Sequence, residues 1–182
     1  AEDVKKQGHR EIPKRGWIPV MVPGAPSAWA GLSEKFGRLL LETVMKPAIT
    51  YAREGYPVSP VTAKLWGNAY RDFSKIFEGE CFKPWFETFA PDGHAPQPGE
   101  LWKSEAHAKT LEKIAKTNAK AFYQGELADR IDAFSRETGG YIRKADLENY
   151  WCEWVEPIHV NYRGYDVCEI PPNGDGIVAL MA

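Results

Sequence analysis

The chain carries almost no net charge. Its 23 lysines and arginines are nearly balanced by 25 aspartates and glutamates, which gives a formal charge of −2 at pH 7. Nucleic-acid binding relies on clustered basic side chains that displace counterions from the phosphates. We therefore expect no nucleic-acid partner.

Long hydrophobic runs are missing as well. The longest uncharged apolar stretch covers residues 18–31 and is interrupted by Pro19, Pro23, Gly24 and Pro26. A membrane-spanning helix needs about 20 consecutive apolar residues. The sequence therefore predicts a soluble protein without a membrane span, and it leaves both the cytoplasm and the periplasm open as its compartment.

Cysteine is scarce and unpatterned. The three cysteines, Cys81, Cys152 and Cys168, are odd in number and show no Cys-x-x-Cys spacing. A disulfide framework pairs its cysteines, and a structural zinc site uses closely spaced ones. We expect three free, partly buried thiols.

Histidines are few and scattered. None of them has a partner at the helical ligand spacing of a His-Glu-x-x-His motif. We therefore predict no metal site and no cofactor. The four histidines are His9, His94, His107 and His159, of which His107 and His159 are interpreted as structural or exposed side chains.

The sequence does have enough apolar residues for one core, and many helix signals. Of its 182 residues 43% are hydrophobic, which suits one compact unit and not two full domains. Apolar residues recur every three or four positions, with serine, proline or glycine at the boundaries. The predicted helices cover residues 27–36, 39–54, 59–77, 104–117, 126–138 and 144–150, with a kink at Pro47.

Two stretches depart from the helical pattern. Residues 78–100 mix prolines and glycines with aromatic residues and keep no period, which predicts a long loop. Residues 158–170 alternate in polarity around Arg163-Gly164, which predicts a hairpin that ends at Pro171-Pro172. The fold class expected from these patterns is mostly α with a C-terminal β-hairpin.

The segment Asn173, Gly174, Asp175 and Gly176 lies between the predicted hairpin and an apolar helical run at 177–182. That run stops at the last residue, so we interpret the chain as a fragment. The glycines could expose backbone N–H groups that hold an anion, or they could only serve a sharp turn. We favour the turn, with positive φ in at least one residue, and expect Gly174→Ala to cost about 1 kcal/mol of stability.

No catalytic group can be assigned from residue types and spacing. The carboxylate pairs Asp129 with Asp132 and Glu148 with Glu153 fit solvated helix faces as well as they fit acid–base catalysis. Clustered aromatic residues are interpreted as core and not as a sugar-stacking surface. They are Phe82, Trp85, Phe86, Trp151 and Trp154.

An ordered series of short segments resembles the large subunit of γ-glutamyltransferases and covers nearly all of the chain from residue 16 onward. These segments are Val22-Pro23-Gly24, Lys35-Phe36-Gly37, Val44-Met45-Lys46-Pro47, Ala52-Arg53-Glu54-Gly55-Tyr56-Pro57, Ala121-Phe122-Tyr123-Gln124-Gly125, Gly139-Gly140-Tyr141-Ile142, Asp146-Leu147-Glu148-Asn149-Tyr150, Tyr162-Arg163-Gly164-Tyr165-Asp166-Val167 and Pro171-Pro172-Asn173-Gly174.

The resemblance implies an N-terminal-nucleophile hydrolase with an αββα core. Such a precursor cleaves itself, and the new N-terminal threonine of the small subunit becomes the nucleophile, with its own α-amine as base. Residues 1–182 would be one fragment, with 16–150 as the helical lobe and 151–182 as the start of the core sheet and the following helix. The small subunit would be its partner, and a γ-glutamyl compound such as glutathione the substrate.

The family's nucleophile, oxyanion and glutamate-binding residues would lie downstream of the matched segments, and its carboxylate-binding arginine upstream. The resemblance therefore assigns no catalytic residue to this chain, and the chain is expected to be inactive alone. Three alternatives stay open: a related acylase, a poly-γ-glutamate depolymerase, and a non-catalytic helical binding module.

Overall fold

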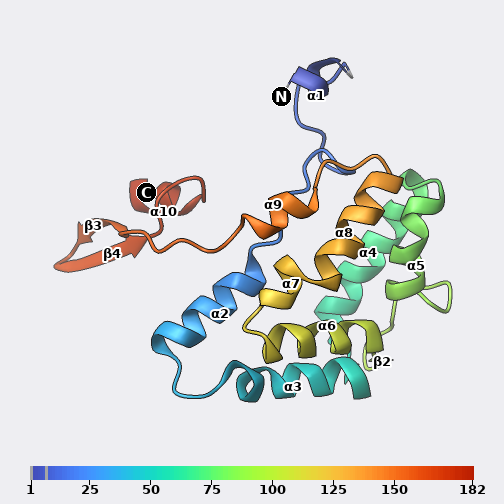
Figure 1. Cartoon of the computed structure of the whole chain (residues 1–182), viewed down its shortest axis with the longest axis horizontal. Coiled ribbons are helices and arrows are strands. Elements are labelled where there is room, and N and C mark those ends of the chain that lie inside the picture. The colour runs from blue at the N-terminus through green and yellow to red at the C-terminus, as the bar shows by residue number, and fades with distance from the viewer. Residues whose placement is uncertain (1, 7) are drawn as a thin grey trace. The chain divides into compact units, whose positions relative to one another are not determined.

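The computed structural model describes residues 2–6 and 8–182 and is mostly helical (Figure 1). It divides into two compact units, Ala1–Tyr150 and Trp151–Ala182. The elements of the first unit are α1 Glu2–Lys6, α2 Ala25–Phe36, α3 Leu41–Glu54, β1 Tyr56–Pro57, α4 Pro60–Ile76, the 3-10 helix η1 Glu80–Phe82, α5 Lys83–Phe89, β2 Leu101–Trp102, α6 Glu105–Lys116, α7 Lys120–Gln124, α8 Glu126–Glu137 and α9 Lys144–Glu148. Those of the second unit are β3 Ile158–Tyr162, β4 Tyr165–Glu169 and α10 Gly176–Met181.

The predicted helices are confirmed, because their boundary signals act locally. Ser59 caps α4 by accepting a hydrogen bond from the Thr62 N–H at 3.2 Å, and Ser104 caps α6 in the same way from the His107 N–H. Helix α3 runs through Pro47 as one element, with that residue on the exposed side. The kink at Pro47 stays a prediction.

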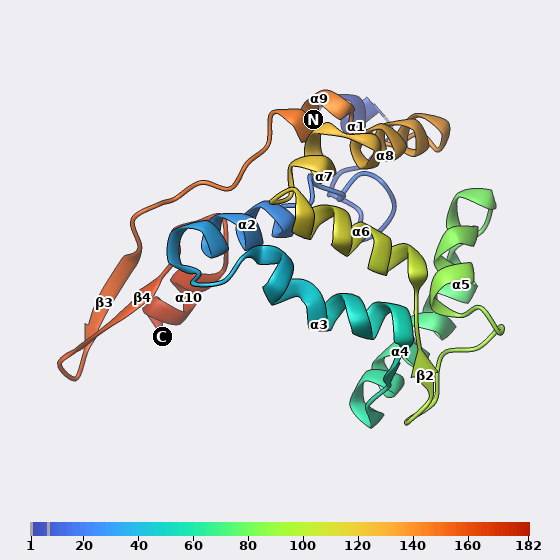
Figure 2. The same cartoon turned by 60° about the horizontal axis from the view of Figure 1, so that its bottom comes forward.

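The core of the first unit lies where α3 packs beside α6 (Figure 2). Leu41, Met45 and Ile49 recur at helical spacing on the buried face of α3. They meet small side chains of α6, among them Ala108 and Ala115, which let the two helices approach closely. The same buried cluster extends to α7 through Tyr123 and to α9 through Leu147.

The loop predicted for residues 78–100 is wrong over its first half, which forms η1 and α5. Pro84 does not prevent this, because it lies in the first turn of α5, where its missing N–H would have no helical partner. The helix is stabilised by distant aromatic contacts: Trp85 meets Phe73 of α4 at a centroid distance of 4.8 Å. Local periodicity does not encode such contacts.

A second antiparallel pair was also not predicted. Tyr56 of β1 pairs with Trp102 of β2, and Pro57 pairs with Leu101. The expectation of a single hairpin is therefore corrected to two small antiparallel pairs.

The second unit contains the predicted hairpin. Val160 pairs with Val167, and the two-residue turn is formed by Arg163 and Gly164, whose φ values are 52° and 86°. Two consecutive residues at positive φ match the right-handed twist of the flanking strands. Helix α10 follows and contacts both strands.

In residues 2–6 and 8–182, every helix is too short or too polar to cross a lipid bilayer.

Candidate functional site

The predicted turn at Asn173 to Gly176 lies in the second unit, between β4 and α10. Asn173, Gly174 and Asp175 are exposed. Asp175 occupies the N-cap position of α10 but accepts no side-chain hydrogen bond from the helix, and its carbonyl accepts from the Val178 N–H at 3.0 Å. The segment is thus a short strand-to-helix connection, as its glycines suggested.

The expected backbone shape of this turn is wrong. None of the four residues has positive φ, and Asp175 adopts φ −82° and ψ 4°. A β-carbon on Gly174 would meet only the Ile170 side chain, at 3.8 Å, which is ordinary contact. The expected cost of Gly174→Ala therefore has no basis in the structure.

The glycine requirement lies instead at Gly176. A β-carbon there would be 2.6 Å from Glu169 Oε2 and 3.0 Å from Glu169 Cβ. The carboxylate can rotate away, but the Cβ belongs to the end of β4 and can move only with the strand. Close packing of α10 on β4 thus explains this glycine without a ligand.

A serine and a histidine do meet in the first unit, but as a helix cap. Ser104 Oγ lies 2.8 Å from His107 Nδ1, and the imidazole ring packs against Phe89 and Trp102. Nucleophilic catalysis by such a pair needs a third group that orients the imidazole. No carboxylate contacts this ring in the described part of the chain, so the pair stabilises the start of α6.

Three of the four candidate carboxylates are engaged in ion pairs. Asp132 contacts Arg136 at 2.9 Å, while Asp129 and Glu148 both contact Lys144, at 2.7 and 3.7 Å. The hydrogen bond from Arg136 lowers the pKa of Asp132, and the hydrogen bond to Asp129 raises the pKa of Lys144. Both shifts move the pKa further from neutral pH, whereas a general acid or base works best with a pKa near the working pH.

The aromatic residues near 82–86 pack against one another. Phe82 stacks on Phe77 with centroids 4.3 Å apart, and Trp85 contacts Phe73, Phe86 and Phe89. They are half-buried. This arrangement supports a packing role for the aromatic residues of η1 and α5.

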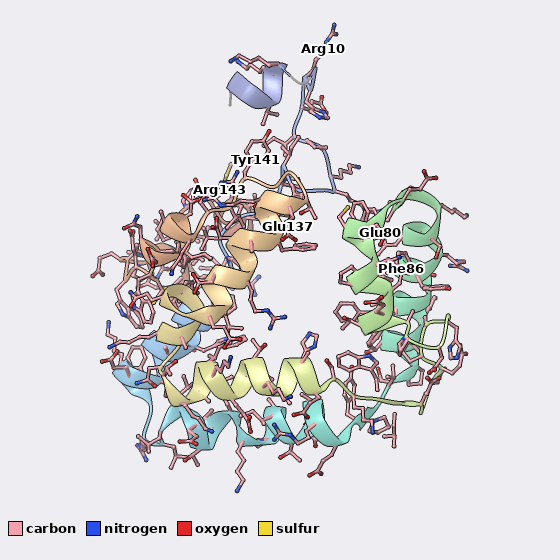
Figure 3. All side chains as sticks on the ribbon, turned by 45° about the vertical axis from the view of Figure 1, so that its right-hand side comes forward. Arg10, Glu80, Phe86, Glu137, Tyr141 and Arg143 are labelled. Atoms are coloured by element: carbon pink, nitrogen blue, oxygen red, sulfur yellow. The ribbon has the colours of Figure 1, made fainter. Side chains whose placement is uncertain are left out.

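A concavity of about 1210 Å³ lies between α5, α6 and α8. Figure 3 shows α5, with Phe86 labelled, and α8, with Glu137 labelled, on either side of α6. Side chains such as Phe122 and Ile131 line its apolar part, and charged side chains of both signs line the rest. Several of these charges already pair with each other, as in Lys113 with Glu126, so the concavity presents no obvious recognition group.

One group of potential metal ligands was missed by the sequence reasoning. Asp92, His94 and Glu100 lie together in the connection between α5 and β2. These three residues do not show helical ligand spacing, because they lie in an irregular segment. A histidine flanked by carboxylates within a short proline- and glycine-rich loop is the signal that could have found them.

The comparisons with known proteins agree on one family. The family model described as gamma-glutamyltranspeptidase matches residues 1–182. The glutathione hydrolase-like YwrD proenzyme of Bacillus subtilis is 35% identical over 181 residues, which is 98% of this chain and 33% of that protein. The acylase ACY 1 proenzyme of a Pseudomonas species is 33% identical over 84% of this chain and 26% of its own length.

Solved structures give the same result. A cephalosporin acylase from Bacillus halodurans superposes with a TM-score of 0.95 at 54% identity, over 98% of this chain and 33% of its own. The γ-glutamyltranspeptidase of Helicobacter pylori superposes with a TM-score of 0.81 at 32% identity, over 94% of this chain and 48% of its own. The chain spans about a third of the length of the curated relatives that it matches.

Proposed function

The chain belongs to the γ-glutamyltranspeptidase family, and from this premise we propose that it is an internal large-subunit segment of an enzyme that transfers or hydrolyses γ-glutamyl groups. The observation that carries the proposal is the match itself. It extends over 98% of this chain but over only 33% of a glutathione hydrolase-like proenzyme. The chain therefore corresponds to part of a longer precursor.

In this proposal the chemistry is supplied by the rest of the precursor. The resemblance implies a threonine nucleophile at the start of the small subunit, activated by its own α-amine, with backbone donors for the oxyanion. In the described part of this chain, the Ser104–His107 contact is a helix cap, and Asp129 and Asp132 are held in ion pairs. Residues 16–150 would form the helical wall and 151–182 would enter the αββα core.

The exposed face of the hairpin supports this place for the second unit. Register pairs put Val160 opposite Val167 and Tyr162 opposite Tyr165, so these four side chains share one face. They are 40%, 43%, 59% and 79% exposed respectively. A sheet face of this composition is normally covered by another layer, which further strands and helices of the precursor would supply.

An acylase is the second candidate, and a specific observation favours it. The identity to the Bacillus halodurans cephalosporin acylase is 54%, against 32% to the Helicobacter pylori transpeptidase. Both candidates use the same kind of nucleophile and differ in the acyl group that they accept.

The test is to express a precursor that contains these residues together with the downstream small-subunit sequence. Its turnover of γ-glutamyl-p-nitroanilide and of an acylated cephalosporin would then be compared. We expect saturable release of one of the two products by the self-cleaved protein, and none by the 182-residue chain alone. Turnover by the chain alone that is lost on mutating a single serine or threonine within it would overturn the proposal.

A further inference from the structure

The connection between α5 and β2 brings three metal-ligand side chains together. Asp92, His94 and Glu100 each offer one ligand atom, and these three atoms lie within 4.8 Å of one another. The segment runs on the side of the first unit where α5 leads into β2 (Figure 2). We propose that these three side chains bind one divalent first-row transition-metal ion, with Zn²⁺ as the principal candidate.

The spacing is close to what such an ion requires. Zn²⁺ binds imidazole nitrogen and carboxylate oxygen at about 2.1 Å, which separates tetrahedral ligand atoms by about 3.4 Å and opposite ligand atoms by about 4.2 Å. The three ligand atoms of Asp92, His94 and Glu100 lie within 4.8 Å of one another, so each separation has to shorten by at most about 1.4 Å. All three residues lie outside the helices.

A hydrogen bond holds the His94 imidazole in the tautomer that suits metal binding. His94 Nδ1 lies 2.9 Å from the Ala95 carbonyl oxygen, and a carbonyl oxygen can only accept. Nδ1 therefore carries the hydrogen, and Nε2 is left with the free lone pair. Metal-bound histidines commonly donate their second ring N–H to a backbone carbonyl in this way, which fixes the ring.

The loop that carries the ligands is anchored at both ends. The Gly93 carbonyl accepts a hydrogen bond from the Tyr70 hydroxyl of α4. At the other end, Val58, which is 1% exposed, accepts from the Gly99 N–H at 2.8 Å and donates to the Glu100 carbonyl at 2.9 Å. Because the loop is already ordered in the folded chain, ion binding costs little further conformational entropy.

Charge also favours a cation at this place. Within residues 2–6 and 8–182, neither Asp92 nor Glu100 forms an ion pair with a lysine or arginine. Glu100 Oε2 accepts from the Gln97 N–H at 2.8 Å, which leaves Oε1 available. One imidazole with two carboxylates suits Zn²⁺ and its neighbours better than Mg²⁺ or Ca²⁺, which prefer all-oxygen sites.

The ion would join the two ends of the connection between α5 and β2, residues 90–100, and would leave one coordination position for water. The site is independent of the proposed enzyme activity, since none of its residues belongs to the transfer machinery.

The test uses the full chain, freed of metal with a chelator and titrated with ZnCl₂ by calorimetry. We expect saturable one-to-one binding that is at least about tenfold weaker in His94→Ala and in Asp92→Asn. Glu100→Gln should weaken binding similarly, while its amide oxygen can still accept from Gln97. Co²⁺ should give visible absorption bands that are lost in the same variants.

The matched controls are His159→Ala and Cys168→Ser, because these two residues face each other across the hairpin and could bind zinc themselves. Both variants should bind Zn²⁺ as the original chain does. Absence of saturable binding, or a His94→Ala affinity equal to that of the original chain, would overturn the proposal. So would loss of binding in the hairpin variants alone.

Discussion

The Tyr123 hydroxyl donates a hydrogen bond to the Pro23 carbonyl at 2.7 Å and accepts one from the Ser27 N–H at 3.1 Å, across about a hundred residues of sequence. Tyr123 is 1% exposed. Helix α2 has no side-chain cap of its own at Gly24, so a tyrosine from α7 satisfies one of the N–H groups at its start. This contact joins the start of α2 to α7.

Tyr123→Phe should therefore destabilise the chain by about 1–3 kcal/mol, because the buried Ser27 N–H loses its acceptor while the ring still fills its site. Urea denaturation of the two proteins measures the difference. Tyr51→Phe is the matched control on α3, where the side chain is 59% exposed, and should change stability by less than about 0.5 kcal/mol. Equal effects of the two substitutions would show that the Tyr123 hydroxyl does not stabilise the fold.

Gly176→Ala should loosen the second unit, whereas Gly174→Ala should not. The added β-carbon at 176 would approach Glu169 Cβ to 3.0 Å and push α10 from β4, while the one at 174 has room. Overpacking of this kind costs about 1–3 kcal/mol. Amide hydrogen exchange of residues 176–181 should be faster in Gly176→Ala and unchanged in Gly174→Ala. The reverse order would restore the original expectation about Gly174.

The helices with clear local signals could be predicted from the sequence to within a few residues. Ser104 caps α6 and Gly139 follows α8, and both signals act on the nearest turn of backbone. Helix α5 could not be predicted, because it is stabilised by contacts such as that of Trp85 with Phe73 of α4 and shows no hydrophobic periodicity of its own. The β1–β2 pair could not be predicted either, because the residues that it joins are distant in sequence.

The candidate site was predictable in kind but not in detail. A strand-to-helix connection at 173–176 follows from the glycines between two patterned segments, and the structure has it. Which glycine is required depends on the approach of Gly176 to Glu169, a contact that composition does not reveal. The grouping of Asp92, His94 and Glu100 likewise depends on how the loop folds back on Val58.

Acid should remove stability through the ion pairs of α8. The hydrogen bond from Lys113 lowers the pKa of Glu126, and that from Arg136 lowers the pKa of Asp132. A carboxyl whose pKa is lower in the folded state stabilises the fold above its unfolded pKa, which is about 4, and this contribution is lost as pH falls through the folded value. The melting temperature should therefore decrease below about pH 4.

The double variant Glu126→Gln, Asp132→Asn should lower the melting temperature at pH 7 and converge with the original chain at low pH. Glu137→Gln is the control, because within the described residues Glu137 forms no ion pair. It should leave the pH dependence unchanged. Parallel curves for the double variant and the original chain would show that these pairs contribute nothing.

The 182-residue chain should self-associate through the second unit. Strands β3 and β4 form a two-stranded sheet, so within the described residues each strand has one edge without a strand partner. An unpaired edge beside an exposed apolar face attracts another chain. Sedimentation velocity should show a weight-average mass that rises with concentration.

The apolar face of the hairpin can be separated from other exposed apolar surface, such as that of α2. Val160→Lys places a charge on the hairpin face and should restore a monomer, whereas Leu32→Lys, on α2 at a position 52% exposed, should not. If Leu32→Lys alone restores the monomer, the helix face drives association and the role of the hairpin is wrong. A strict monomer at every concentration, with the hairpin amides protected from exchange, would also contradict it. Under the proposed function, co-expression with a downstream small-subunit sequence should abolish association of the original chain, because a further layer would then cover the face that Val160 shares with Val167.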